Sequence, residues 1–195
     1  MLNIFFVARL KAYNEPEVVE KAMNLFWKNG FEATSMQMLE KEMGINKFSI
    51  YASFENKNGL FIESLKCYKE KLGVLIHKMK NSKKGIADIE QYFYNFIEFS
   101  KGTELGKGCF VTNSVNEIKE NTDQKIKNVL SIFLNDIKQV FFEKLQESNS
   151  NNKNDIALQK EADYLVLSIF GLANASKFFS KEQIANHIEN IFKRM

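Results

Sequence analysis

Residues 34–61, TSMQMLEKEMGINKFSIYASFENKNGLF, constrain the fold more than any other part of the chain. They begin with two good helix N-capping residues, and apolar residues then recur at three- and four-residue steps, which indicates a short helix with one apolar face. Gly44 follows at once, where a helix-ending left-handed residue is favoured. Asn46 can cap a second helix, whose inner side carries Ile50, Tyr51 and Phe54. Two short helices joined in this way predict a helix-turn-helix, whose second helix can enter the major groove of DNA.

The surrounding residues add a longer pattern. An apolar helix ends in Phe and is followed by a Gly-aromatic pair, Thr-Ser, the first short helix, Gly-apolar, a second short helix ending in Tyr-x-x-Phe, and a Lys before a Leu. The pattern is carried by Ala22, Leu25, Phe26, Trp27, Gly30, Phe31, Thr34, Ser35, Gly44, Ile45, Tyr51, Phe54, Lys57 and Leu60. Over residues 9–72 the chain therefore resembles the tetracycline-repressor (TetR-like) family of transcriptional regulators.

The resemblance implies a fold and a function. The fold is an N-terminal helix-turn-helix DNA-binding domain of three helices over residues 12–72, and a larger helical domain over residues 73–195 that binds an effector and forms a dimer. The function is that of a one-component transcriptional regulator, a repressor that a small-molecule effector releases from a near-palindromic DNA operator. The alternative is an α-helical small-molecule-binding or interaction protein whose helix-turn-helix is structural only.

The composition independently favours an all-α fold. The chain has one proline in 195 residues, and few turn clusters interrupt the helical windows. No alternating strand pattern competes, so the sequence predicts about nine helices in an all-α fold. The expected helices cover residues 16–28, 36–43, 47–54, 57–79, 86–100, 109–118, 122–147, 155–179 and 180–193.

Charge and reactive residues exclude several classes of protein. The formal net charge is only +3, so DNA binding would depend on a few placed cations and backbone amides. Cys67 and Cys109 form no CxxC pair, and His77 and His187 lie far apart, which argues against a disulfide scaffold or a metal site. There is no Ser/His/Asp set and no suitably spaced carboxylate pair. We therefore expect no enzyme, metal or cofactor.

The N-terminal residues carry no recognisable targeting signal. The apolar run in MLNIFFVARL is too short to span a bilayer, and no signal-peptide cleavage site follows it. We expect a cytoplasmic protein without a membrane partner.

The predicted recognition helix supplies the candidate contacts with bases. Asn46, Lys47, Phe48 and Ser49 occupy positions expected to be exposed, and polar side chains there can donate to base edges or phosphates. The ring of Phe48 either touches a thymine methyl group or packs on its neighbours.

Other candidates come from the family resemblance, which implies phosphate contacts from Ser35, Tyr51 and Lys57. Tyr51 has the alternative of being a core aromatic. The full candidate DNA-binding set is Thr34, Ser35, Asn46, Lys47, Phe48, Ser49, Tyr51 and Lys57.

The second half of the chain is rich in aromatic residues at helical spacing. Residues 108–117, GCFVTNSVNE, resemble a Gly-Cys-apolar-x-x-Asn segment of one TetR-like subgroup. The candidate effector pocket comprises Tyr92, Phe96, Phe99, Phe110, Asn113, Phe133 and Phe141, and ordinary core packing is the alternative for each. For Cys109 we expect a buried structural thiol and not a redox sensor.

The last two expected helices are the candidate dimer interface. Small residues, Gly171, Ala173 and Ala175, allow helices to approach closely, and two helices from each protomer would form a four-helix interface. The apolar positions assigned to these helices are Leu165, Val166, Ile169, Leu172, Ala173, Ile184, Ile188 and Ile191.

Overall fold

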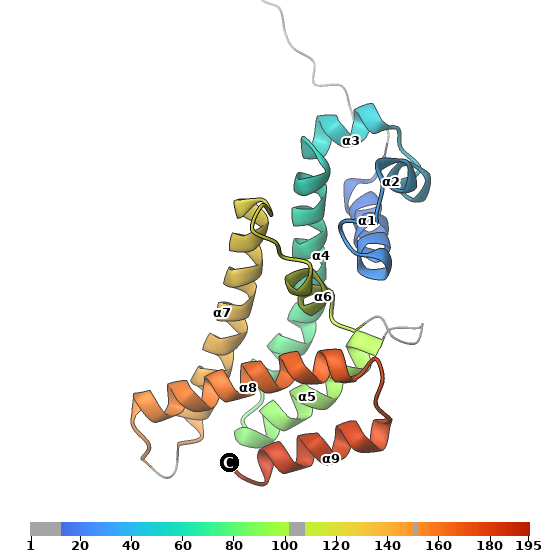
Figure 1. The fold of residues 1–195 in the computed structure, drawn as a ribbon. Coiled ribbons are helices and arrows are strands. Elements are labelled where there is room, and N and C mark those ends of the chain that lie inside the picture. Colours follow the sequence, from blue (N-terminus) through green and yellow to red (C-terminus); the bar gives the residue numbers. More distant parts are fainter. Residues whose placement is uncertain (1–12, 102–107, 150–151) are drawn as a thin grey trace, which may run out of the picture.

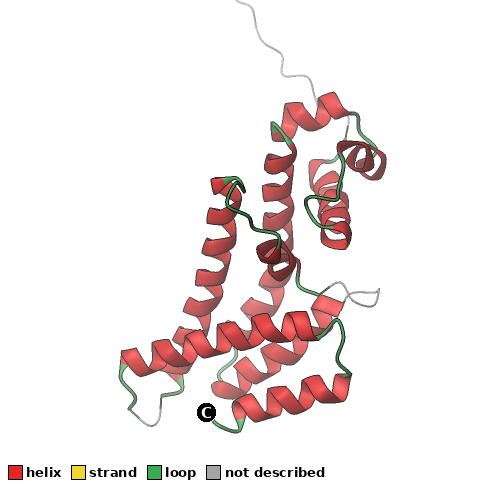
Figure 2. Ribbon diagram, viewed as in Figure 1, coloured by secondary structure: helices red, strands yellow, loops and turns green. Residues whose placement is uncertain are grey.

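The computed structural model describes residues 13–101, 108–149 and 152–195, and over these ranges it contains nine α-helices and no strand (Figures 1 and 2). The helices are α1 (Glu15–Asn29), α2 (Met36–Met43), α3 (Lys47–Phe54), α4 (Lys57–Asn81), α5 (Ile86–Lys101), α6 (Phe110–Asn116), α7 (Gln124–Glu147), α8 (Asp155–Ala175) and α9 (Lys181–Phe192). The predicted all-α fold is confirmed, and most helix ends lie within two residues of their expected positions.

The end of α8 is the largest difference. The helix was expected to reach residue 179 but ends at Ala175, where the hydroxyl of Ser176 donates to the carbonyl of Ala173 at 2.8 Å. Ser180 then starts α9 with a capping box, in which Ser180 and Gln183 satisfy each other's backbone N–H groups. The strong start of α9 leaves residues 176–179 as a turn.

Local caps explain the helix-turn-helix. The side chains of Ser35 and Asn46 accept hydrogen bonds from backbone N–H groups in the first turns of α2 and α3, at 3.2 and 2.9 Å. Gly44 ends α2 with φ +71°, a left-handed conformation that glycine adopts without steric cost. Ile50 and Phe54 are the buried residues of α3. The predicted motif is therefore present with its predicted caps.

Helix α4 connects the two parts of the molecule. In Figure 1, α3 lies over its N-terminal end with α1 and α2 to one side, α7 runs on the other side, and α5, α8 and α9 lie near its C-terminal end. The buried apolar side chains form one cluster that extends from α1 to α9. The predicted domain boundary after Leu72 falls within α4 and stays a prediction. No helix in the described ranges is long and apolar enough to cross a membrane.

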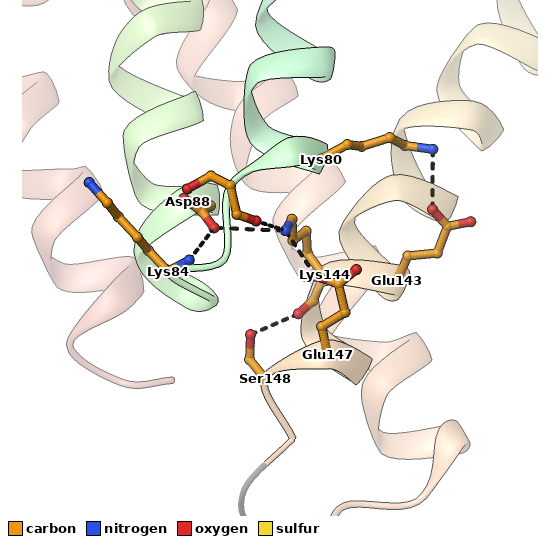
Figure 3. A network of polar contacts seen from close by, with 8 residues as sticks. Lys80, Lys84, Asp88, Glu143, Lys144, Glu147 and Ser148 are labelled. Carbon is orange, nitrogen blue, oxygen red and sulfur yellow. Dashed lines mark hydrogen bonds and ion pairs between the residues drawn. The ribbon is translucent and has the colours of Figure 1, made fainter.

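A buried lysine joins α7 to the turn between α4 and α5 (Figure 3). Lys144 is 1% exposed, and its ammonium group donates to the carbonyl of Ser82 at 2.5 Å and to the Glu147 carboxylate at 2.8 Å. Asp88 lies 3.8 Å from the same ammonium group and accepts the backbone N–H of Lys84 at 2.8 Å. A buried charge needs such partners, so these contacts, here called the Lys144 clamp, fix the α4–α5 turn.

The clamp changes the pKa of Asp88. Burial by itself raises that pKa, but hydrogen bonds from Ser82 and Lys84 together with the charge of Lys144 hold the pKa below its ordinary value. The ionised form of Asp88 is therefore favoured in the folded chain.

Candidate nucleic-acid interface and interior cavity

Helix α3 presents an aromatic and basic surface to solvent. Asn46 and Lys47 are exposed and Ser49 is half-buried. The ring of Phe48 is 86% exposed, so packing on its neighbours does not account for its position. The ammonium group of Lys47 lies 5.4 Å from the centre of the Tyr51 ring, a cation–π distance that places both side chains on one surface.

The candidate phosphate ligands flank α3. Ser35 is exposed at the start of α2, and Lys57 is half-buried at the start of α4. Tyr51 is 39% exposed, unlike the buried Ile50 beside it, and so is not a core aromatic. An exposed helix N-terminus and an ammonium group on either side of a recognition helix can both bind anionic oxygen.

Thr34 does not join this surface. Its side chain is fully buried, and its hydroxyl donates to the carbonyl of Gly30 at 2.6 Å. Since that leaves no surface for a phosphate, we omit Thr34 from the proposed interface.

Two contacts near α3 were not predicted from the sequence. The backbone N–H of Lys47 donates to the carboxylate of Glu40 at 2.5 Å, which stabilises the N-terminus of α3 but occupies a place where a phosphate could otherwise bind. The hydroxyl of Tyr13 lies 2.6 Å from that of Ser53 and ties the segment before α1 to the recognition helix. Neither pair repeats at a helical spacing, so periodicity gave no signal for them.

Lys57 rests on an aromatic ring. Its ammonium group lies 4.4 Å from the ring centre of Phe31. Desolvation lowers the pKa of Lys57, and the negative charges of Glu32 and Glu117 partly offset that effect. A phosphate beside Lys57 would act in the same direction as those two carboxylates.

The candidate effector residues divide into two groups. Tyr92, Phe96 and Phe133 line an interior cavity of about 30 Å³. The other lining residues are Leu72, Cys109, Val111, Thr112, Leu134, Ile137, Val166, Ile169 and Phe170. The cavity is far below the roughly 300–1,000 Å³ of ligand pockets.

The remaining four candidates do not line that cavity. Phe99 and Phe110 pack against the ring of Tyr68 at centroid distances of 5.5 and 5.7 Å, and Phe141 packs against Tyr92 at 5.7 Å. The side-chain oxygen of Asn113 accepts a hydrogen bond from Lys177 at 2.5 Å. The three aromatic rings therefore follow the alternative of core packing.

The junction between α5 and α6 contacts α1. The indole N–H of Trp27 donates to the carbonyl of Gly108 at 2.9 Å. The next residue, Cys109, is buried, and its sulfur accepts a hydrogen bond from the Tyr68 hydroxyl at 3.4 Å. This burial agrees with the structural role expected for the thiol.

The candidate dimer helices carry two apolar faces. Of the eight assigned apolar residues, seven are buried within the chain and Val166 is half-buried, so they belong to the protomer core. A different set, Tyr164, Leu167, Phe178 and Phe179, is exposed. A groove of about 460 Å³ between α8 and α9 is lined by Leu167, Ser168, Gly171, Leu172, Ala175, Phe179, Gln183, Ile184 and His187. Because these inner residues are covered within the protomer, the apolar surface that the last two helices leave available is their outer face.

Comparison with known proteins identifies the family. Residues 18–63, from α1 into α4, match the family model of bacterial regulatory proteins of the tetR family. Over 181 residues the chain is 25% identical to the biofilm operon icaADBC HTH-type negative transcriptional regulator IcaR of Staphylococcus aureus (strain Newman), covering 90% of this chain and 97% of IcaR. The chain carries a tetR-family domain.

A second relative matches over a shorter region. The HTH-type transcriptional repressor ComR of Escherichia coli (strain K12) is 32% identical over 111 residues, which cover 54% of this chain and 51% of ComR. The chain thus spans about half the length of ComR in this match.

Solved structures share the fold of this chain. A cysteine mutant of the TetR family regulator CifR, complexed with 26-bp double-strand operator DNA, superposes with a TM-score of 0.84 at 21% identity and covers 95% of this chain and 98% of its own. The reduced form of E. coli NemR superposes with a TM-score of 0.76 at 14% identity, covering 91% and 92%. At these identities the likeness concerns the fold.

Proposed function

We propose that this TetR-family regulator is a repressor that binds a near-palindromic operator as a two-fold dimer and is not an enzyme. The observation that carries the proposal is the exposed surface of α3, with Lys47 and Phe48 between the flanking Ser35 and Lys57. Two such helices, one from each protomer, would enter successive major-groove turns. Repression agrees with the names of the relatives IcaR and ComR. Such a protein acts in the cytoplasm, where bacterial DNA lies.

The residues of the interface have separate roles in this proposal. Ser35, Tyr51 and Lys57 contact phosphates and orient α3, as a hydroxyl at a helix N-terminus, a phenol and an ammonium group can do. Asn46 and Lys47 donate to base edges or nearby phosphates, and Ser49 lies on the same side of α3. The exposed ring of Phe48 contacts the methyl group of a thymine.

The dimer uses the outer face of α8 and α9. Leu167 and Phe179, both more than half exposed, line the groove on that face, and apolar side chains of this size favour burial against a second copy. The groove beside Gly171 leaves room for a partner side chain.

The effector enters the interior cavity and enlarges it. The cavity lies among α4, α5, α6, α7 and α8, and all of its lining side chains are uncharged. A charged ligand would lose its hydration there without a partner, so we propose a compact, uncharged and mainly apolar effector. The hydroxyls of Tyr92 and Thr112 are the polar groups available to orient it. Binding favours a form with the wrong spacing of the two α3 helices, and DNA is released.

Fluorescence anisotropy tests the proposal. Duplex DNA from upstream of the protein's own gene is compared with a scrambled duplex across a salt series. We expect at least tenfold preference for the native duplex, about 1.4 kcal/mol. Equal weak binding to both duplexes, fading with salt, would favour the alternative of a purely structural helix-turn-helix.

A further inference from the structure

A carboxylate from the C-terminal part of the chain binds the turn between α1 and α2. Glu117 directly follows α6, and its Oε2 atom accepts the backbone N–H of Phe31 at 2.9 Å and that of Glu32 at 3.2 Å. Both N–H groups donate to one carboxylate oxygen, so the contact is charge-assisted. It joins residues that are 86 and 85 positions apart in the sequence.

The turn is shaped to receive this carboxylate. Gly30 has φ +83°, and a Cβ atom at this position would lie 2.3 Å from Oε1 of Glu117, closer than any real contact. On its other side, the carbonyl of Gly30 accepts the hydroxyl of the buried Thr34. The turn is therefore fixed from within by Thr34 and from outside by Glu117.

The same turn places the proposed phosphate ligands. Phe31, whose N–H group Glu117 binds, is the ring beneath the Lys57 ammonium group. Ser35 follows Thr34 directly and caps α2. A second contact reinforces the arrangement, because the side-chain amide of Asn58 donates to Asp123 at the start of α7, at 3.0 Å.

We propose that Glu117 is a positioning residue for DNA binding, which holds Ser35 and Lys57 at the places that the operator phosphates require. The inference rests on the proposed DNA interface and gives that interface a route of coupling to the cavity. Val111 and Thr112 of α6 line that cavity, and Glu117 lies at the end of the same helix. A ligand that displaces α6 would move Glu117, and with it the α1–α2 turn, without requiring α4 to bend.

Two substitutions separate the charge of Glu117 from its geometry. Glu117→Gln keeps an acceptor oxygen but removes the negative charge that favours charged Lys57. Glu117→Ala removes both. Glu120→Ala is the matched control, since Glu120 is an exposed acid three residues away whose backbone carbonyl, and not its carboxylate, contacts Lys127.

The experiment measures the affinity of the full chain for the native and scrambled duplexes across a salt series, with thermal unfolding alongside. We expect Glu117→Ala to weaken binding to the native duplex about tenfold and to reduce the salt slope by about one counterion, because Lys57 is displaced. Glu117→Gln should give a smaller loss, and Glu120→Ala none. A purely structural role would lower the unfolding temperature of Glu117→Ala and leave the salt slope unchanged.

The possible results separate a failure of the Glu117 proposal from a failure of the proposed DNA-binding function. If the wild-type chain prefers the native duplex and Glu117→Ala binds with unchanged affinity and slope, the inference is wrong while the proposed function stands. If the wild type shows no preference, both are overturned. Should Glu117→Ala not fold, amide exchange of Phe31 and Glu32 in Glu117→Gln decides: faster exchange with unchanged DNA affinity would also overturn the inference.

Discussion

A charged contact lies near each end of α4, and the two contacts differ in burial. At the C-terminal end, Lys144 is buried and contacts Ser82, Glu147 and Asp88 (Figure 3). At the N-terminal end, Glu117 reaches the α1–α2 turn from a half-exposed position. Removing one partner of a buried ion pair costs about 3–5 kcal/mol, whereas a hydrogen bond to a charged group contributes about 1.5–3 kcal/mol.

This difference decides which end can move. A ligand typically couples two sites by about 1–3 kcal/mol, which is too little to break the Lys144 clamp but enough to release a contact such as that of Glu117. We therefore expect the clamp to stay fixed during regulation while the DNA-binding end adjusts.

Breaking the clamp should have the largest effect on stability. Lys144→Met leaves Asp88 buried without its cation, and we expect the free energy of unfolding to fall by about 3–5 kcal/mol, measured by urea denaturation. Lys80→Met is the control, because its ion pair with Glu143 at 3.2 Å is exposed and should contribute at most about 1 kcal/mol. Equal losses in the two variants would remove the contrast between buried and exposed contacts.

Acid should weaken the clamp through Asp88. Because the pKa of Asp88 in the folded chain lies below its ordinary value of 3.8, the ionised carboxylate stabilises the fold above that value, and this stabilisation is lost as the pH falls through the lowered pKa. Asp88→Asn should lower the free energy of unfolding at pH 7 by about 1–3 kcal/mol. Urea denaturation between pH 3 and 7 should also show a flatter acid dependence in Asp88→Asn, and a wild-type slope in that variant would contradict the assignment.

At the DNA-binding end, losses should appear in affinity and not in stability. We expect Lys57→Ala to weaken binding to all duplexes and to reduce the salt slope by about one counterion, and Tyr51→Phe to weaken binding by about 1 kcal/mol through a lost hydrogen bond. Anisotropy measures both. Lys66→Ala, which changes an exposed cation paired with Glu63, is the control and should bind like wild type.

Of these variants, Phe48→Ala should have the smallest effect on stability and the clearest effect on the DNA sequence that the protein prefers. Phe48→Ala removes an almost fully exposed ring, so the free energy of unfolding should change by less than about 0.5 kcal/mol. Selection from a randomised duplex pool should show relaxed preference at one thymine position. An unchanged selected sequence would mean that the ring does not read the operator.

The sequence predicted the elements of the fold well because their signals are local. Ser35, Gly44 and Asn46 stand at helix ends whose geometry depends on adjacent residues, and the structure uses all three as expected. The contact of Glu117 with Phe31 joins distant segments through a backbone N–H, and no side-chain pattern marks such a contact.

The direction in which each side chain faces was the second feature that the sequence did not predict. Helical spacing identified the aromatic residues of α5 and α7 but did not tell cavity-lining Phe133 from core-packed Phe141, since both recur at helical intervals. Likewise α8 is apolar on two sides, so spacing alone did not show that Leu165 lies in the protomer core while Leu167 faces solvent.

The hydrogen bond from Trp27 to Gly108 has a practical consequence. Trp27 is the only tryptophan in the sequence, and its indole joins α1 to the segment that leads into α6. Indole emission changes wavelength and intensity when the ring gains or loses a hydrogen bond or meets water. The chain therefore carries an intrinsic optical probe at the junction where its two halves meet, and titrations can be followed at that point without attaching a dye.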